Sequence, residues 1–237
     1  VDLGRDFVAL PARRLRSKSY LFANNRESRS QFTGLRDFGP LHPLDAPPHL
    51  LFLFREQDRA AARTLAAALR GAGGRERYNF PGFQALFKTE LHIDASPIVL
   101  PDLGEGSMAD ALAAVQARRL SVPNALPVVV LPEGEDNGYL AHKADFSHAG
   151  IPTQVCTLRV IQDEYALKWA IANIALQVFY KAGGQPWKVR PTAEPTLVVG
   201  ISQSHKVRVS GAGRAVEKYF AFTGMTDNSG LFQKIQV

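Results

Sequence analysis

The chain has 237 residues, of which 46% are hydrophobic and 21% are charged, and this composition is that of a globular protein with a sizeable core. Its single cysteine, Cys156, excludes an internal disulfide and a cysteine-based metal site, and it fits a reducing, cytoplasmic setting. The 28 lysine and arginine residues exceed the 22 aspartate and glutamate residues, so an anionic partner is favoured. No run of about 18 apolar residues is present, so no membrane partner is expected.

Residues 1–47 are predicted to form an N-terminal linker segment without regular structure. Arginine and lysine residues cluster in this segment, and its end, PLHPLDAPP, is rich in proline. Such a composition is typical of a connection that runs into a domain.

Residues 48–190 alternate between short apolar runs and stretches with helical spacing. The predicted strands are His49–Phe54, Thr89–Asp94, Ser96–Leu100, Leu126–Leu131 and Pro152–Leu158, and the predicted helices are Glu56–Arg70, Ser107–Arg119, Asn137–His148 and Leu167–Lys181. This alternation predicts an α/β domain with a Rossmann-like parallel sheet flanked by helices. In such sheets, ligands are expected at the carboxyl ends of the strands.

The spacing changes after residue 190 to that of strands and hairpins. Strands are predicted at Thr196–Ile201, Lys206–Ser210 and Lys218–Thr223, with a turn at Gly211–Gly213. Residues 191–237 are too few to close a core by themselves, so a second, incomplete domain is expected to begin here.

The helix predicted at Leu167–Lys181 is apolar on almost every side. Asn173 and Gln177 are four residues apart and in line with Lys181, so at about 100° per residue the three form one narrow polar stripe. The rest of the helix is expected to be buried. A solvated seam would explain the stripe, and so would a ligand that is anionic or offers a carbonyl, because the Lys181 ammonium can only donate.

Further polar residues precede this helix. Tyr139 and Lys143 are four residues apart and share one helix face, and Gln154 lies in the segment GIPTQV. Two lysines match the charge of one phosphate monoester, about −1.5 to −2 at neutral pH, and tyrosine and glutamine add neutral donors. None of these residues is a nucleophile with an adjacent base, so the pattern indicates recognition, although an ordinary exposed helix pair would also explain Tyr139 and Lys143.

The ordered set of these motifs resembles a known family. The segments YLAHK, GIPTQV and WAIANIALQVFYKAGGQPW resemble the MID domain of prokaryotic Argonaute proteins, and TLVVGISQSHK resembles the opening strand of their RNase H-like PIWI domain. GLRDFGPL resembles the linker that precedes a MID domain. The resemblance implies that residues 1–47 are a linker, that residues 48–190 are a MID domain and that residues 191–237 begin a PIWI domain.

The resemblance also implies a site for the 5′-phosphorylated end of a short guide strand. By position, the tyrosine, lysine, glutamine and second lysine with which the family binds this phosphate are Tyr139, Lys143, Gln154 and Lys181. The asparagine and glutamine one and two turns before the last lysine match Asn173 and Gln177. In the family, the glutamine helps to hold a divalent cation between guide phosphates, together with the protein's own C-terminal carboxylate, so Gln177 is the expected ligand of a Mg²⁺ ion.

One residue departs from the pattern of family members that cleave, or slice, a target strand. Their first PIWI strand ends in V-G-I-D, and this aspartate binds catalytic metal, whereas the present chain has Ser202 after Ile201. Serine is neutral and a poor Mg²⁺ ligand where a two-metal site relies on carboxylates. We therefore expect no slicing and no catalytic residue in this chain, although an ordinary loop residue at position 202 fits the sequence equally well.

The sequence thus predicts a catalytically inactive Argonaute that binds a guide RNA or DNA, with RNA favoured, and presents it to a complementary target strand, with DNA favoured. Its expected role is prokaryotic defence against invading DNA. The resemblance to inactive short members implies a partner effector with an APAZ domain and a TIR, Sir2 or nuclease activity. Two alternatives remain open, namely a fragment of a guide-directed slicer and an α/β domain that binds a small phosphate metabolite.

Overall fold

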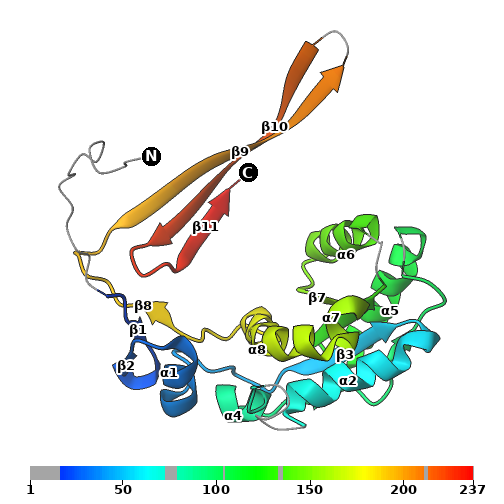
Figure 1. The fold of residues 1–237 in the computed structure, drawn as a ribbon, viewed down its shortest axis with the longest axis horizontal. Helices are drawn as coiled ribbons and strands as arrows, with labels where there is room; N and C mark the ends of the chain where they lie inside the picture. The colour runs from blue at the N-terminus through cyan, green and yellow to red at the C-terminus, as the bar shows by residue number, and fades with distance from the viewer. Residues whose placement is uncertain (1–16, 73–78, 104, 133–135, 211–212, 237) are drawn as a thin grey trace, which may run out of the picture.

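A computed structural model describes residues 17–72, 79–103, 105–132, 136–210 and 213–236. The strands of this part of the chain form three sheets (Figure 1). One is parallel and lies among most of the helices, one is a small antiparallel sheet near the N-terminus, and one is a long antiparallel sheet at the C-terminus.

The parallel sheet confirms the predicted Rossmann-like α/β fold. Its strands are β3 (His49–Phe54), β4 (His92–Ile93), β5 (Ile98–Val99), β6 (Ala125–Leu131) and β7 (Gln154–Thr157). They are ordered β4-β3-β6-β7, β5 also pairs with β3, and every pairing is parallel. All of β6 and nearly all of β3 is buried, which explains their unbroken apolar sequences HLLFLF and ALPVVVL.

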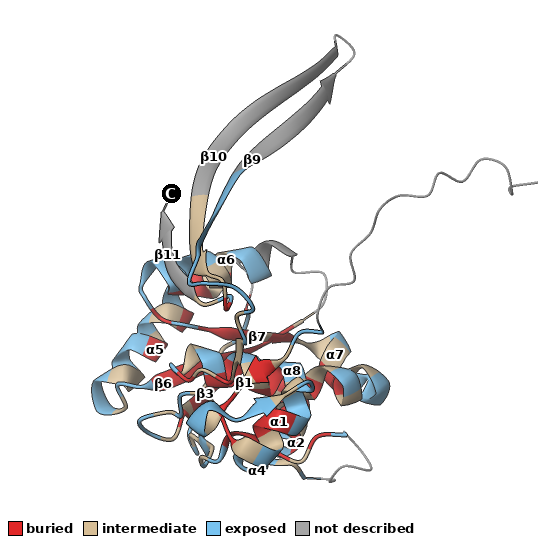
Figure 2. Ribbon diagram, turned by 90° about the vertical axis from the view of Figure 1, so that its left-hand side faces the viewer, coloured by how far each residue is buried: buried red, intermediate tan, exposed pale blue. Residues whose placement is uncertain are grey.

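Helices cover both faces of this sheet. Alternate residues of β3 point to opposite sides, so Leu50, Phe52 and Phe54 belong to one hydrophobic cluster and Leu51 and Leu53 to another. The first cluster includes side chains of α2 (Arg59–Arg70), α4 (Phe83–Phe87), α7 (Leu158–Gln162) and α8 (Glu164–Lys181), and the second includes side chains of α5 (Met108–Ser121) and α6 (Asp136–His148). Figure 2 shows the buried residues on the strands and on the helix faces turned toward them.

The N-terminal segment has more structure than the sequence predicts. It contains β1 (Tyr20–Leu21), the 3-10 turn η2 (Ala23–Asn25), β2 (Glu27–Ser28) and α1 (Gln31–Phe38), and β1 pairs with β2 and with β8 (Lys188–Val189). The expectation of irregular structure was therefore wrong for these residues. Two-residue strands have no periodicity to detect, and their partner β8 lies far along the chain.

Two further 3-10 turns precede helices of the parallel-sheet unit. They are η3 (Glu56–Asp58), before α2, and η4 (Glu105–Ser107), before α5. Ser107 is the N-cap of α5, but its hydroxyl donates to the carbonyl of Asp102 and does not cap the helix.

The C-terminal strands are longer than the sequence predicts. β9 (Leu197–Ser210) runs through both strands predicted before the turn, and it pairs with β10 (Gly213–Asp227), which in turn pairs with β11 (Phe232–Gln236). The register between β9 and β10 shifts between Lys218 and Phe220. The predicted turn at Gly211–Gly213 falls mostly on residues 211–212, which lie outside the described residues.

No helix in the part of the chain that the structure describes is long and apolar enough to cross a membrane.

The C-terminal half of α8 is held by aromatic packing. Phe179 is fully buried, its ring stacks on that of Phe87 at a centroid distance of 4.4 Å, and it also contacts Phe83. A Cβ atom on Gly184 would lie 2.4 Å from the Phe179 ring, so the chain can turn back over this ring only at a glycine. This packing fixes the end of α8, where Lys181 lies.

We expect Phe179→Ala to lower the free energy of unfolding by about 3–5 kcal/mol, because it leaves a cavity beside Phe87. Urea denaturation would measure the change. The neighbouring Tyr180 is 60% exposed, so Tyr180→Ala is the matched control and should cost less than about 0.5 kcal/mol. Equal losses for the two variants would contradict the packing described here.

Candidate functional site

Three of the predicted site residues meet where α6, α8 and the first residue of β7 approach one another. Lys143 lies on α6, Gln154 begins β7, and Lys181 is the last residue of α8. Gln154 pairs with Val128, in the middle of β6. The candidate residues therefore meet at the amino end of β7, whereas the sequence predicts ligands at the carboxyl ends of the strands.

Hydrogen bonds position the two lysine ammonium groups. Lys181 Nζ donates to Gln154 Oε1 at 2.6 Å, and Lys143 Nζ donates to the carbonyl oxygen of Thr153 at 2.6 Å. Gln154 is only 4% exposed, and its amide nitrogen donates to the carbonyl of Val155 at 3.1 Å. Both ammonium groups thus bind consecutive residues of one extended segment.

Among the described residues, no carboxylate balances the positive charge of the site, since neither Lys143 nor Lys181 forms an ion pair with an aspartate or glutamate. Partial burial, and then repulsion from the Lys143 ammonium, lowers the pKa of Lys181 to about 8. At pH 7 Lys181 is still mostly charged, and an anion placed between the two lysines would favour this charged form.

Tyr139 lies on the exposed side of Lys143. Its side chain is 42% exposed, and Lys143 Nζ lies 6.0 Å from the centroid of its ring. The prediction that Tyr139 and Lys143 share one helix face is confirmed. The arrangement places an accessible aromatic ring next to the cationic pair.

The remaining two predicted residues lie further along α8. Gln177 is exposed, one turn before Lys181, and lines the same cavity as Lys181, with a volume of about 350 Å³. Asn173 is exposed as well, but it lines a different cavity with Lys168 and Trp169. Since Asn173 is two turns, or roughly 12 Å, from Lys181, the structure does not bring it to the lysine pair.

The expectation that the rest of the helix Leu167–Lys181 is buried was wrong for two aromatic residues. Trp169 is 58% exposed and Tyr180 is 60% exposed, whereas Ile171 and Val178 are fully buried. Tyr165, which precedes the predicted helix but belongs to α8, is 72% exposed. Only one face of α8 packs on the sheet, and its outer face is aromatic as well as polar. A hydrophobicity pattern does not distinguish buried from exposed aromatic residues, so this surface could not be predicted from the sequence.

Ser202 lies within a strand. It is exposed on β9 and pairs with Phe222 of β10, and β9 continues to Ser210. The alternative of a loop residue at this position is therefore wrong. Over the described residues, no group of three or more histidine, cysteine, aspartate or glutamate side chains could hold a metal ion.

The chain was compared with known proteins. The family model described as "Piwi domain" matches residues 126–237, from β6 to the end of the chain. No curated protein sequence matches the chain.

Three solved structures share the fold. Drosophila Piwi matches with a TM-score of 0.57 and 16% identity over 90% of this chain and 30% of its own. Clostridium butyricum Argonaute, bound to a guide DNA and a 19-mer target DNA, matches with a TM-score of 0.58 and 16% identity over 89% of this chain and 28% of its own. Aquifex aeolicus Argonaute matches with a TM-score of 0.53 and 17% identity over 92% of this chain and 31% of its own.

The chain therefore shares its fold with Argonaute and Piwi structures, and its residues 126–237 are similar to the Piwi domain. The chain spans about a third of the length of the structures it matches.

One residue of the site was not predicted from the sequence to take part in it. Cys156 is buried, and Gln154 Nε2 lies 3.8 Å from its Sγ. Burial raises the pKa of the Cys156 thiol to about 11, so it remains protonated at neutral pH.

We expect the Cys156 thiol not to react with 5,5′-dithiobis(2-nitrobenzoic acid) at pH 8 in the folded protein, because it is buried and protonated. In urea the same thiol should react fully, which supplies the control in one absorbance measurement. A rapid stoichiometric reaction without urea would show that the site is more open than the structure indicates.

Proposed function

We propose that this protein binds the 5′-phosphorylated end of a short guide strand and presents the strand for pairing to a complementary target. The observation that carries this proposal is the pair of ammonium groups of Lys143 and Lys181, which approach the same segment without a balancing carboxylate. The match to an Argonaute solved with a guide DNA and a target DNA supports it.

The charges of the site suit a phosphate monoester. Two ammonium groups balance a charge of about −1.5 to −2, and charge-assisted hydrogen bonds to phosphate oxygens are stronger than neutral ones. The Tyr139 ring would stack on the first base, and stacking of this kind tolerates any base. Sequence specificity would then come from base pairing between guide and target, with RNA the favoured guide and DNA the favoured target.

Lys181→Ala should weaken binding of a 5′-phosphorylated oligonucleotide about 10- to 100-fold, because it removes a partly buried charge-assisted contact. The affinity of this variant for the same oligonucleotide with a 5′-hydroxyl should fall much less. Fluorescence anisotropy with both oligonucleotides would measure the two effects.

Lys168→Ala is the matched control, since Lys168 lies on the same helix but lines a different cavity. It should leave the preference for the 5′-phosphate unchanged. Equal losses for the phosphorylated and hydroxyl strands in Lys181→Ala would refute the phosphate site. Failure of both strands to bind the unaltered protein would favour the small-phosphate-metabolite alternative.

The described residues offer few ligands to a Mg²⁺ ion at the guide phosphates. Gln177 offers an amide oxygen, a ligand type that Mg²⁺ accepts, but no carboxylate lines its cavity. Phosphate oxygens of the strand would therefore have to supply the charge that holds the ion. We propose Gln177 as a ligand of such an ion only in the presence of a bound strand.

We further propose that this protein does not slice its target and that a partner effector with an APAZ domain supplies the enzymatic activity. Ser202 supports the first part, because the resemblance aligns it with the metal-binding aspartate of slicing members, and a neutral hydroxyl is a poor replacement for that carboxylate. The same substitution argues against the slicer alternative.

A guide-loaded sample of the full protein should leave a matched target strand uncut in the presence of Mg²⁺. Gel electrophoresis of labelled target, with a mismatched target as the control, would test this. Guide-dependent cleavage that chelation abolishes would establish the slicer alternative.

A further inference from the structure

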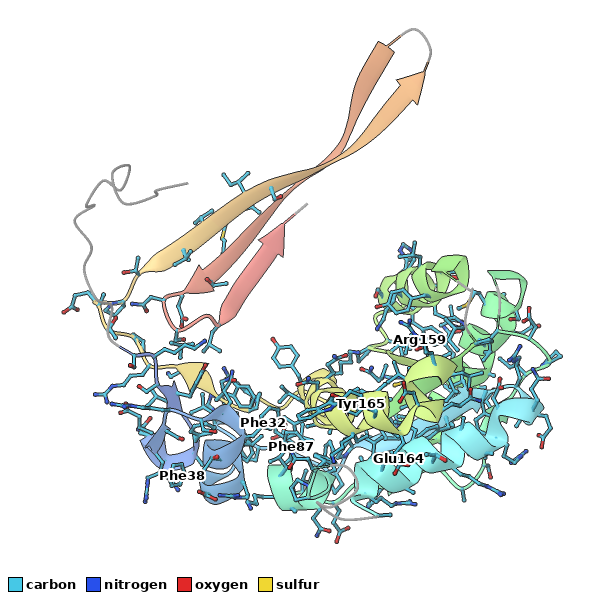
Figure 3. The ribbon with its side chains drawn as sticks, in the orientation of Figure 1. Phe32, Phe38, Phe87, Arg159, Glu164 and Tyr165 are labelled. Carbon is cyan, nitrogen blue, oxygen red and sulfur yellow. The ribbon has the colours of Figure 1, made fainter. Side chains whose placement is uncertain are left out.

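One side of α2 has a row of arginine residues. Arg59, Arg63 and Arg70 fall within an arc of roughly 40°, because each residue of an α-helix turns the chain by about 100°. Arg63 and Arg70 are exposed, and Arg59 is partly exposed. The helix lies at the outside of the parallel-sheet unit, and Figure 3 shows side chains that project away from it. The row therefore presents guanidinium groups to the solvent.

The arginine row borders a cavity, which we call the α2 pocket. Its volume is about 240 Å³, and it lies between α2, the carboxyl half of β3 and the segment that follows β4. All three arginines line it. The apolar part of its lining consists of Phe52, Phe54, Ala62, Ala66, Ile93 and Pro97. The pocket is thus apolar inside and basic at its edge.

Among the described residues, Asp94 is the only carboxylate that lines the α2 pocket, and it already has partners. Its side chain is 8% exposed, and its carboxylate accepts hydrogen bonds from Arg118 at 3.2 and 3.4 Å and from the backbone nitrogen of Ser96 at 2.9 Å. Asp94 is therefore part of the wall, and its charge is balanced from the side that faces away from α2.

The three arginines differ in what they bind. Glu56 accepts hydrogen bonds from Arg59 Nε and Nη2 at 2.7 and 2.6 Å, and the Arg59 guanidinium lies 5.4 Å from the centroid of the Phe54 ring. Among the described residues, Arg63 and Arg70 form no ion pair with a carboxylate. Two guanidinium groups at the edge of the pocket are therefore available to an anionic partner.

This combination suits an acidic peptide segment with one apolar side chain. Arginine binds carboxylates through paired hydrogen bonds, and an apolar pocket takes an aliphatic or aromatic side chain of a partner. The volume is below the range of small-ligand sites, about 300–1,000 Å³, so it suits a single side chain better than a nucleoside.

The aromatic residues of the α2 pocket argue against a single-stranded nucleic acid as the occupant. Proteins that bind single strands stack the bases on accessible aromatic rings. Among the described lining residues, the aromatic ones are Phe52 and Phe54, and both are only 3% exposed. They form a buried floor and offer no ring face for stacking.

We propose that the α2 pocket docks an acidic segment of a partner protein, with an apolar side chain in the pocket and carboxylates on Arg63 and Arg70. These two arginines are about 10 Å apart along the helix axis, a distance that an extended segment spans in about three residues. The inference does not rest on the anchoring of a guide strand, because the pocket lies beside β4 and the lysine pair beside β7, at opposite edges of the sheet.

Fluorescence anisotropy with labelled acidic peptides would test this inference. The probes are the peptides EDELEDE, EDEFEDE and EDESEDE, which differ only in the central residue. The leucine or the phenylalanine peptide should bind the unaltered protein about 10-fold more tightly than the serine peptide, because its central side chain is buried. Added salt should weaken the binding of all three peptides, since the contacts at the edge of the pocket are exposed.

Arg63→Glu should weaken binding of the tighter peptide about 5- to 20-fold, because it replaces attraction by repulsion at the edge of the pocket. Arg29→Glu is the matched control, since Arg29 is also exposed but does not line the pocket, and it should change the affinity less than about 2-fold. Ala66→Leu should fill the pocket and abolish the advantage over the serine peptide, with circular dichroism to confirm that the variant is folded.

The inference is overturned if no peptide binds the unaltered protein, or if Arg63→Glu and Arg29→Glu bind the tighter peptide equally. Arg63→Glu should also leave the affinity for a 5′-phosphorylated oligonucleotide unchanged. If it lowers this affinity and leaves peptide binding intact, the arginine row contacts nucleic acid and the inference is wrong. Loss of the preference for a 5′-phosphate in the unaltered protein would refute only the guide-strand proposal.

Discussion

The packing of α8 on the parallel sheet is the constraint on which the rest of the site depends. Ile171, Val178 and Phe179 bury one face of this helix in the same hydrophobic cluster as β3 and β6, and Phe179 stacks on Phe87. Because these contacts fix the last turn, Lys181 reaches the side chain of Gln154 at the start of β7. A helix held less firmly would leave its last ammonium group in water.

In the free protein, the positive charge of Lys181 is electrostatically unfavourable. Lys181 is partly buried, lies close to a second ammonium group and has only neutral hydrogen-bond partners, and its pKa falls accordingly. An anion that binds between the two lysines removes the repulsion and gains charge-assisted hydrogen bonds. In the proposed function, the feature that is unfavourable without a ligand would favour a compact, doubly charged group.

The N-terminal segment contributes to the structure around this site. β1 pairs with β8, and Trp187 packs among Tyr20, Phe22 and Phe32. These contacts hold the chain where it leaves α8 and passes toward β9. A segment that resembles a simple connection in the sequence is therefore part of the support for the residues beside Lys181.

The sequence by itself determined the α/β class, because unbroken apolar runs such as His49–Phe54 and helical spacings such as that of α8 arise from local periodicity. It also determined which polar residues to consider, since Lys143, Gln154 and Lys181 stand in a recognisable order. The structure brings these three together. Only the tertiary structure decided that the site lies at the amino end of β7, that Asn173 lines a separate cavity and that Tyr180 is exposed beside Lys181. These features depend on which face of α8 meets the sheet and on contacts between residues far apart in the chain. Hydrophobic periodicity is a local property of the sequence, so it predicts neither the packed face nor the long-range contacts.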